Sequence, residues 1–138
     1  MSGDIHIEAG PYRFEARLER QAAPQTCRAF EELLPWESEL VHVRWSGEGV
    51  WIPLGDRKFD FGYENHTSHP APGHFIFYPG GISETEILLA YGGVDFSSKL
   101  GQLAGNHFLT VVSGGEALAA LGNHVLWKGA TRVRFAVA

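Results

Sequence analysis

Cysteine, long apolar runs and basic leader segments are all scarce in this chain. Cys27 is the single cysteine among 138 residues, so no disulfide can form within the chain and no cysteine-based zinc motif is present. No apolar run approaches the roughly 20 residues of a membrane span. The opening residues, MSGDIHIEAG, lack the basic and apolar regions of a secretory signal. We therefore expect a soluble, cytoplasmic protein without membrane association.

Positive charge is also in short supply. Eleven Lys and Arg stand against sixteen Asp and Glu, a net charge of -5, and this balance argues against a general nucleic-acid-binding surface. Motifs for phosphate cradles, nucleophile elbows and HExxH metal sites are absent, and no cofactor is expected. With 44% hydrophobic and 20% charged residues, the composition is that of a globular protein, and the length predicts one domain, residues 1–138.

Glycine, in contrast, is abundant. The 17 glycines fall between short segments of alternating polarity, a pattern typical of strands joined by tight turns. The clearest strand is 12–18, which forms a predicted hairpin with 5–8 through Ala9–Pro11. Further strands are expected at Glu39–Trp45, Gly49–Leu54, Gly73–Tyr78, Glu84–Tyr91, His107–Val112 and Thr131–Val137. About eight strands in so small a domain predict a mainly β fold, a closed or nearly closed antiparallel barrel with two short helices, since closure removes exposed edges.

Two segments have helical rather than strand periodicity. Pro24 suits a first helical turn, the apolar residues Cys27, Phe30 and Leu34 then follow at helical spacing, and Pro35 ends the helix. This pattern predicts that Cys27 is a buried core thiol and not a nucleophile. The second helix is expected at 115–123.

Three segments resemble cyclophilins in order and approximate spacing: AAPQTCRAFEELLP at 22–35, GVWIPLGD at 49–56 and QLAGNHFLTV at 102–111. Together with FYPGGISETEIL and the C-terminal RVRFAVA, they look like a bacterial family of cyclophilin-like proteins of unknown function. This resemblance implies the cyclophilin barrel and implies no reaction.

The departures from true cyclophilins concern the groove that those enzymes use for proline. By position, their active-site Gln falls on Pro53, their proline-pocket Phe on or near Glu86, and their Trp on Gln102, whereas their pocket His is retained as His107. Their Arg corresponds to Arg44 only with a one-residue slip. Because an unpartnered carboxylate is costly in an apolar proline pocket, the resemblance implies a barrel that has been kept and a groove that has been re-used.

Glu84, Glu86 and His107 are the candidate catalytic residues. On a strand, Glu84 and Glu86 would share one face, with Cα atoms roughly 6.6–6.8 Å apart. Two neighbouring carboxylates can hold a cation, bind an amine or guanidinium, or divide acid and base roles; alternatively, they are solvated charges at a strand start. His107 could donate a hydrogen bond or act as a general base near neutral pH, or could be a structural residue.

The candidate ligand-binding residues are Arg44, Trp51, Tyr78 and Gln102. Arg44 is expected to alternate with its neighbours on a strand and to form a clamp with Glu84 or Glu86. Trp51 and Tyr78 would supply pocket walls, although aromatic residues on a small barrel can equally belong to the core.

One loop carries the residue types that bind zinc: Glu64, His66, His69 and His74. Their spacing matches no established motif, and histidines beside Ser and Pro in a loop are ordinarily solvated. We expect no metal.

Three functions from different classes follow from these observations. The first is a barrel that binds, and in one version turns over, a small polar molecule such as an amine, an amide or a cationic metabolite. The second is a prolyl isomerase or peptide-binding module. The third is an accessory subunit of a metabolic enzyme. Exposed tryptophans on a small barrel would also favour a homo-oligomer.

Overall fold

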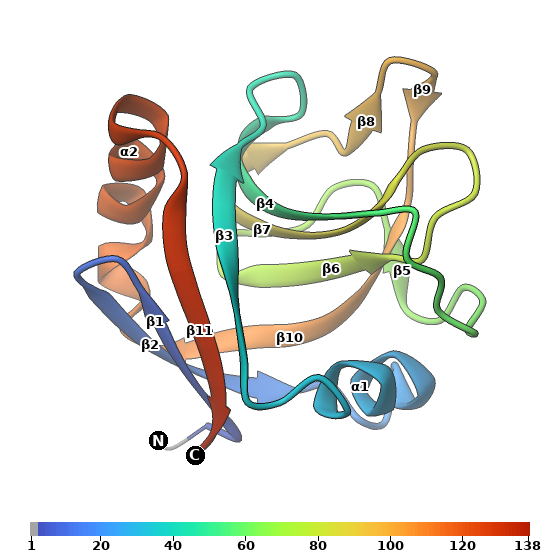
Figure 1. The fold of residues 1–138 in the computed structure, drawn as a ribbon, viewed down its shortest axis with the longest axis horizontal. Coiled ribbons are helices and arrows are strands. Elements are labelled where there is room, and N and C mark those ends of the chain that lie inside the picture. The colour runs from blue at the N-terminus through green and yellow to red at the C-terminus, as the bar shows by residue number, and fades with distance from the viewer. Residues whose placement is uncertain (1–2) are drawn as a thin grey trace.

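The computed structural model describes residues 3–138, and a closed antiparallel barrel dominates it (Figure 1). Around the barrel the strands follow the order β2-β1-β11-β3-β4-β7-β6-β10, and pairing of β10 with β2 closes the ring. The eight strands are β1 (Ile5–Ala9), β2 (Tyr12–Leu18), β3 (Trp36–His42), β4 (Gly47–Gly55), β6 (His74–Tyr78), β7 (Thr85–Val94), β10 (Gly105–Ser113) and β11 (Thr131–Val137). The predicted fold class is confirmed.

Three very short strands lie outside this ring. β5 (His66–Thr67) adds to β10, and β8 (Ser97–Ser98) pairs with β9 (Gly101–Gln102) in a separate arm, drawn at the top of Figure 1. Strands of two residues are too short to show alternation, which is why the sequence pattern does not predict them.

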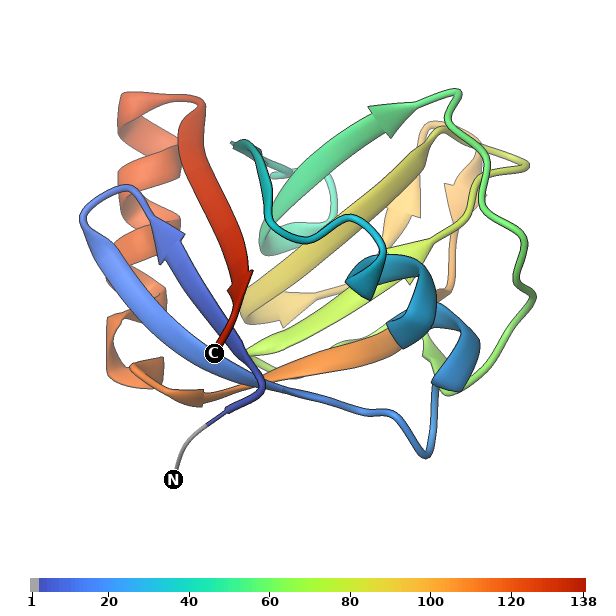
Figure 2. The same cartoon turned by 60° about the horizontal axis from the view of Figure 1, so that its bottom comes forward.

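Two helices pack on different sides of the barrel, as both views show (Figure 2). α1 (Pro24–Glu31) lies against β10, and Pro24 occupies its first turn as predicted. The predicted second helix begins as a 3-10 turn, η1 (Gly115–Ala117), and continues as α2 (Leu118–Lys128), five residues beyond its expected end at Asn123. No helix within residues 3–138 is long and apolar enough to cross a membrane.

A carboxylate from a distant loop caps the N-terminus of α1. Ala23 precedes the helix and its side chain makes no cap. Instead, the backbone N–H and the hydroxyl of Thr26 donate to Glu64 at 2.7 and 2.8 Å. The amide of Asn106 also donates to the Thr26 hydroxyl, at 3.0 Å. A carboxylate at this end of a helix satisfies free N–H groups and complements the helix dipole.

Replacing Glu64 by Ala should lower the free energy of unfolding by about 2 kcal/mol, because two buried donors of Thr26 lose their acceptor. Urea denaturation measures this difference. Glu116→Ala is the control, since Glu116 is an exposed acid, and its effect should stay within about 0.5 kcal/mol. Equal effects of the two substitutions would contradict a capping role for Glu64.

Aromatic side chains fill the barrel interior. Phe30 from α1 packs against Phe108 and Phe135, with ring centroids 5.1 and 5.3 Å away. Cys27 lies beside this cluster, buried as predicted, and its thiol donates to the carbonyl of Phe108 at 3.4 Å. Burial raises the pKa of this thiol to about 12, so Cys27 is not nucleophilic at neutral pH.

A second apolar cluster lies on the outer face of the barrel, beneath the β8–β9 arm. Along β7, Ile87 and Leu89 belong to the barrel interior, whereas Leu88 and Ala90 belong to the outer cluster. The arm adds Phe96 and Leu103, both buried, to that outer cluster; its other members are Val43, Ile76, Tyr78 and Val94, with Trp51 packed against it. β7 is therefore covered on both faces, and its outward face leads to Glu86.

Candidate functional site

A cavity of about 810 Å³ opens where the start of β7 meets the β3–β4 turn and the β8–β9 arm. We name it the Trp–Glu cavity. Its lining residues are Trp45, Trp51, Ser83, Glu84, Glu86, Ser97, Ser98, Lys99 and Leu100. Both glutamates that the sequence singled out therefore face one space, whose size is that of a small-molecule pocket.

Glu86 is the most deeply placed charge-bearing residue of this cavity. It lies between Pro53 on β4 and Tyr78 on β6, and only 5% of it is exposed. Burial, and secondarily the charge of Glu84, raises the pKa of Glu86 to about 8. No ion pair or hydrogen bond from residues 3–138 reaches its carboxyl to offset this. At neutral pH the group is therefore largely protonated, and it can become a carboxylate when a cation approaches.

Two tryptophans form one wall of the Trp–Glu cavity. The rings of Trp45 and Trp51 meet edge to face with centroids 5.6 Å apart. Trp45 is 58% exposed and stands at the mouth of the cavity. The indole N–H of Trp51 is buried without a hydrogen-bond partner among the described residues. The wall thus offers aromatic surface that a flat or cationic ligand can contact.

The opposite wall is the β8–β9 arm, which two serines fasten to the β3–β4 turn. The Ser46 hydroxyl donates to the carbonyl of Ser97 at 3.2 Å and accepts the Ser97 backbone N–H at 3.1 Å. The Ser97 hydroxyl in turn donates to the carbonyl of Trp45, also at 3.2 Å. These contacts hold Trp45 and the arm together across the outer cluster.

Tyr78 supports the site without lining it. It is only 4% exposed, and its hydroxyl accepts the backbone N–H groups of Ile82 and Ser83 at 2.9 and 3.2 Å. It thereby holds the turn that carries Ser83 and Glu84 to the cavity. The predicted role of Tyr78 as a pocket wall is wrong in its geometry, because the outward face of β6 is already covered by the outer cluster.

Arg44 and Gln102 do not line the Trp–Glu cavity, contrary to expectation. β3 ends at His42, so strand alternation does not continue to Arg44, which lies exposed in the following turn. Its charge acts on His42, whose pKa is lowered by burial and then by Arg44. Gln102 is exposed on the arm, and its amide donates to Asp95 at 2.7 Å. The expected clamp between Arg44 and the two glutamates is therefore not formed.

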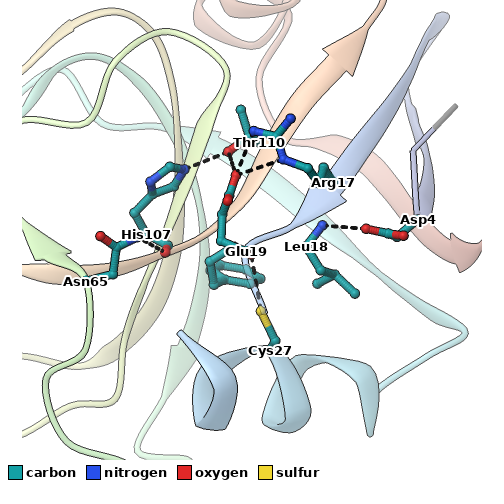
Figure 3. Close-up of polar contacts among 9 residues, drawn as sticks. Asp4, Arg17, Leu18, Glu19, Cys27, Asn65, His107 and Thr110 are labelled. Carbon is teal, nitrogen blue, oxygen red and sulfur yellow. Dashed lines mark hydrogen bonds and ion pairs between the residues drawn. The ribbon is translucent and has the colours of Figure 1, made fainter. Parts of the chain in front are cut away.

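His107 also lies apart from the cavity, in a polar cluster between β2, β6 and β10 (Figure 3). Its Nε2 is 2.8 Å from the hydroxyl of Thr110, which donates to Glu19 at 2.6 Å. Because a carboxylate only accepts, the hydroxyl proton points to Glu19, and Nε2 of His107 must carry the proton that bonds to Thr110. The expectation that His107 shares a pocket with Glu84 and Glu86 is wrong; a bulge between His107 and Leu109 shifts the register of β10 there.

The environment of His107 keeps it neutral. The ring of His74 stacks on it with centroids 3.9 Å apart and planes at 6°. Burial, followed by the proximity of His74, lowers the pKa of His107 to about 4, although Glu19 acts in the opposite direction. His107 is thus a structural hydrogen-bond donor across the neutral range.

The residues of the His-rich loop are dispersed. Glu64 caps α1, His66 stacks on Tyr63 at 4.4 Å, and His69 is 3.4 Å from Asp95. Within the part of the chain that the structure describes, no three His, Cys, Asp or Glu side chains are grouped to hold a metal ion.

The sequence reasoning missed five residues of the cavity: Ser83 in the turn between β6 and β7, and Ser97, Ser98, Lys99 and Leu100 on the arm. One signal was available. Phe96 and Leu103 bracket a short stretch of Ser, Lys and Gly, which is the pattern of a turn anchored by an apolar residue at each end.

Comparison with known proteins places the chain in a family. The model described as "Protein of unknown function (DUF3830)" matches residues 5–137. The chain belongs to the DUF3830 family. The expected membership of a family of unknown function is thus confirmed, and no curated protein matches this DUF3830 chain.

Two solved structures share the fold of the DUF3830 chain. The structure of McbB in complex with tryptophan aligns with a TM-score of 0.69 and 20% identity, over 96% of this chain and 44% of that one. The solution structure of the hypothetical protein AF2241 from Archaeoglobus fulgidus aligns with a TM-score of 0.62 and 17% identity, over 99% and 95% of the two chains. The DUF3830 chain therefore spans less than half of the McbB chain, and at these identities the likeness concerns the fold alone.

Proposed function

We propose that this DUF3830 chain binds a small polar organic molecule in the Trp–Glu cavity. The observation that carries the proposal is Glu86, a residue that is only 5% exposed, that lines the cavity and whose carboxyl has no partner within the described chain. Burying an unpartnered acid costs free energy, and a bound molecule that pairs with it recovers that cost. The aromatic wall beside Glu86 favours a ligand that also presents a flat or apolar face.

The fold comparison supports this proposal from a separate direction. McbB, which shares the fold, was solved with tryptophan bound, a small molecule that combines a large ring with polar groups. We prefer binding to turnover as the function, because His107, the candidate general base, lies in another cluster and not in the cavity with Glu84 and Glu86.

Prolyl isomerisation is the alternative that the cyclophilin resemblance raised. Arg44, the residue that the resemblance would assign to the imide nitrogen, is exposed and outside the cavity. Glu86 further places an acid where a proline ring would need apolar walls. Self-association, the accessory-subunit role and a cytoplasmic location stay predictions.

A ligand screen on two tryptophan variants tests the proposed function. Amino acids, amines, amides and X-Pro peptides are screened by thermal shift, where a ligand at 100 times its Kd should stabilise the fold by about 2.7 kcal/mol. We expect hits whose affinity falls at least about tenfold in Trp45→Ala. The matched control is Trp127→Ala, since Trp127 on α2 is 76% exposed and does not line the cavity.

Two results would contradict the proposed function. One is a screen in which no compound shifts the wild-type melting temperature. The other is a set of hits that bind Trp45→Ala and Trp127→Ala equally well. Hits confined to X-Pro peptides, and lost in Arg44→Ala, would instead restore the prolyl isomerase alternative.

A further inference from the structure

We propose that the ligand of the Trp–Glu cavity is a protonated amine attached to an aromatic ring, with its ammonium held between Glu84 and Glu86 and its ring against Trp45 and Trp51. This inference rests on the proposed function and names the class of molecule that the cavity takes. Four side chains of two kinds carry it, and each lines the same space.

The two carboxyls are placed to share one ammonium group. Glu86 is on β7, and Glu84 directly precedes the first residue of that strand. Extended residues two apart are roughly 6.6–6.8 Å apart and face the same way, and both line the cavity. Their charges act on each other, because Glu84 contributes to the raised pKa of Glu86. An ammonium has three donors, enough to serve both carboxylates and one further acceptor.

Glu84 lies between the Trp–Glu cavity and a neighbouring hollow. Glu84 and Ser83 line both the Trp–Glu cavity and an adjoining hollow of about 660 Å³. Glu84 is exposed whereas Glu86 is buried. An incoming cation therefore meets Glu84 at the surface before it reaches Glu86.

The electrostatics of the cavity favour a cation over a neutral or anionic ligand. Among the described residues, neither glutamate forms an ion pair, so both carboxyls are free to pair with a bound cation. Glu86 gains a favourable ion pair only by giving up its proton to face a cation, and tryptophan faces also attract a cation. Of the side chains between residues 3 and 138 that line the cavity, Lys99 on the arm is the single basic one, and it would meet a carboxylate if the amine also carries one.

Binding of such a ligand should release a proton. In the free protein Glu86 holds its proton near pH 7 because of burial. The ligand arrives as an ammonium and keeps its own proton, so pairing converts the Glu86 carboxylic acid into a carboxylate and its proton passes to the buffer. One proton leaves for each ligand bound, and no covalent bond is made or broken between ligand and protein.

Isothermal titration calorimetry with three indole probes of different charge tests this inference. Tryptamine is cationic, tryptophol is neutral and indole-3-propionate is anionic, while all three carry the same ring. We expect tryptamine to bind at least tenfold more tightly than tryptophol and indole-3-propionate to bind most weakly. Repeating the titration at pH 7 in two buffers of different ionisation enthalpy should show release of about one proton per tryptamine.

The glutamate variants separate the amine inference from the proposed function. Glu86→Gln should lose both the preference for tryptamine and the proton release, and Glu84→Gln should reduce the preference while the release remains. Glu116→Gln, which changes an exposed acid outside the cavity, should behave as wild type. Circular dichroism confirms that each variant is folded.

The possible outcomes distinguish the amine inference from the proposed function. If tryptamine and tryptophol bind equally and Trp45→Ala weakens both, the cavity binds a ligand but the amine inference is wrong. The inference is also wrong if no indole binds while other compounds of the screen do so through Trp45. Tighter binding of tryptophan than of tryptamine, lost in Glu86→Gln, would support it and would add a carboxylate contact to Lys99.

Discussion

Replacing Glu86 by Gln should stabilise the folded chain strongly above pH 7. In the fold the pKa of Glu86 is raised from 4.5 to about 8, first by burial and then by Glu84. The unfolded chain loses this proton near pH 4.5 and the folded chain keeps it, so the wild type loses stability as the pH rises from about 4.5 to about 8. At about 1.4 kcal/mol per pKa unit, the loss at pH 8 is roughly 4 kcal/mol, and Glu86→Gln should avoid it.

Thermal melts between pH 5 and pH 9 measure this effect. The variant should melt on the order of 10 °C above wild type at pH 8 and at nearly the same temperature as wild type at pH 5. Glu84→Gln is the matched control, because Glu84 is exposed on the same face, and it should change the melting temperature only slightly. Parallel pH profiles for wild type and Glu86→Gln would show that the Glu86 carboxyl is hydrated and ionised in the fold.

His107 should destabilise the fold on the acid side. Burial and the stacked His74 lower the pKa of His107 from 6.5 to about 4. The unfolded chain takes up a proton below pH 6.5 and the folded chain does not, so stability is present above pH 6.5 and is lost as the pH falls towards 4. The loss over this range is about 3 kcal/mol. His74 adds to it, since burial lowers its pKa as well.

Urea denaturation of His107→Gln at several pH values tests this expectation. The variant should be less stable than wild type at pH 7, because the hydrogen bond to Thr110 is altered, yet its stability should decline less between pH 6.5 and pH 4. His66→Gln, which changes an exposed loop histidine, should keep the wild-type slope. An unchanged acid slope in His107→Gln would mean that His107 is protonated freely in the folded chain.

These two residues give the fold opposite pH dependences. Glu86 makes the chain less stable as the pH rises, and His107 makes it less stable as the pH falls. The two ranges overlap between about pH 4.5 and pH 6.5, where the opposite slopes nearly cancel, so stability should be greatest there, near pH 5.5. Because they lie in different clusters, their effects should add, which the Glu86→Gln/His107→Gln double variant can show.

The local sequence pattern predicts strands and helices well where one face of the element is exposed to solvent and the other is buried. Strand β2 alternates charged and apolar residues, and its predicted range, 12–18, is the observed one. Its predicted hairpin with β1 is also observed. Helix α1 begins at the predicted proline. In both elements, solvent-exposed and buried residues recur with the period of the element, so the periodicity of the sequence is enough to predict the element.

The candidate site was predictable only in part, because local irregularities of the strands misplaced some of its expected residues. Glu84 and Glu86 were found because residues two apart on a strand share a face. Arg44 and His107 were misplaced because alternation was carried through a turn in one case and a bulge in the other. Both irregularities change which way a side chain points without leaving a clear mark in the local sequence.

The sequence by itself determined the class of fold, because alternating segments between glycines specify many short strands, and its single cysteine excludes a disulfide within the chain. The tertiary structure alone decided that Glu86 is buried and faces a cavity with Trp45 and Trp51. The physical reason is the β8–β9 arm, which closes over the outer face of β7 through Phe96 and Leu103. The burial of Glu86 and its raised pKa depend on how much water that covering segment removes. The sequence of β7 alone does not contain this information.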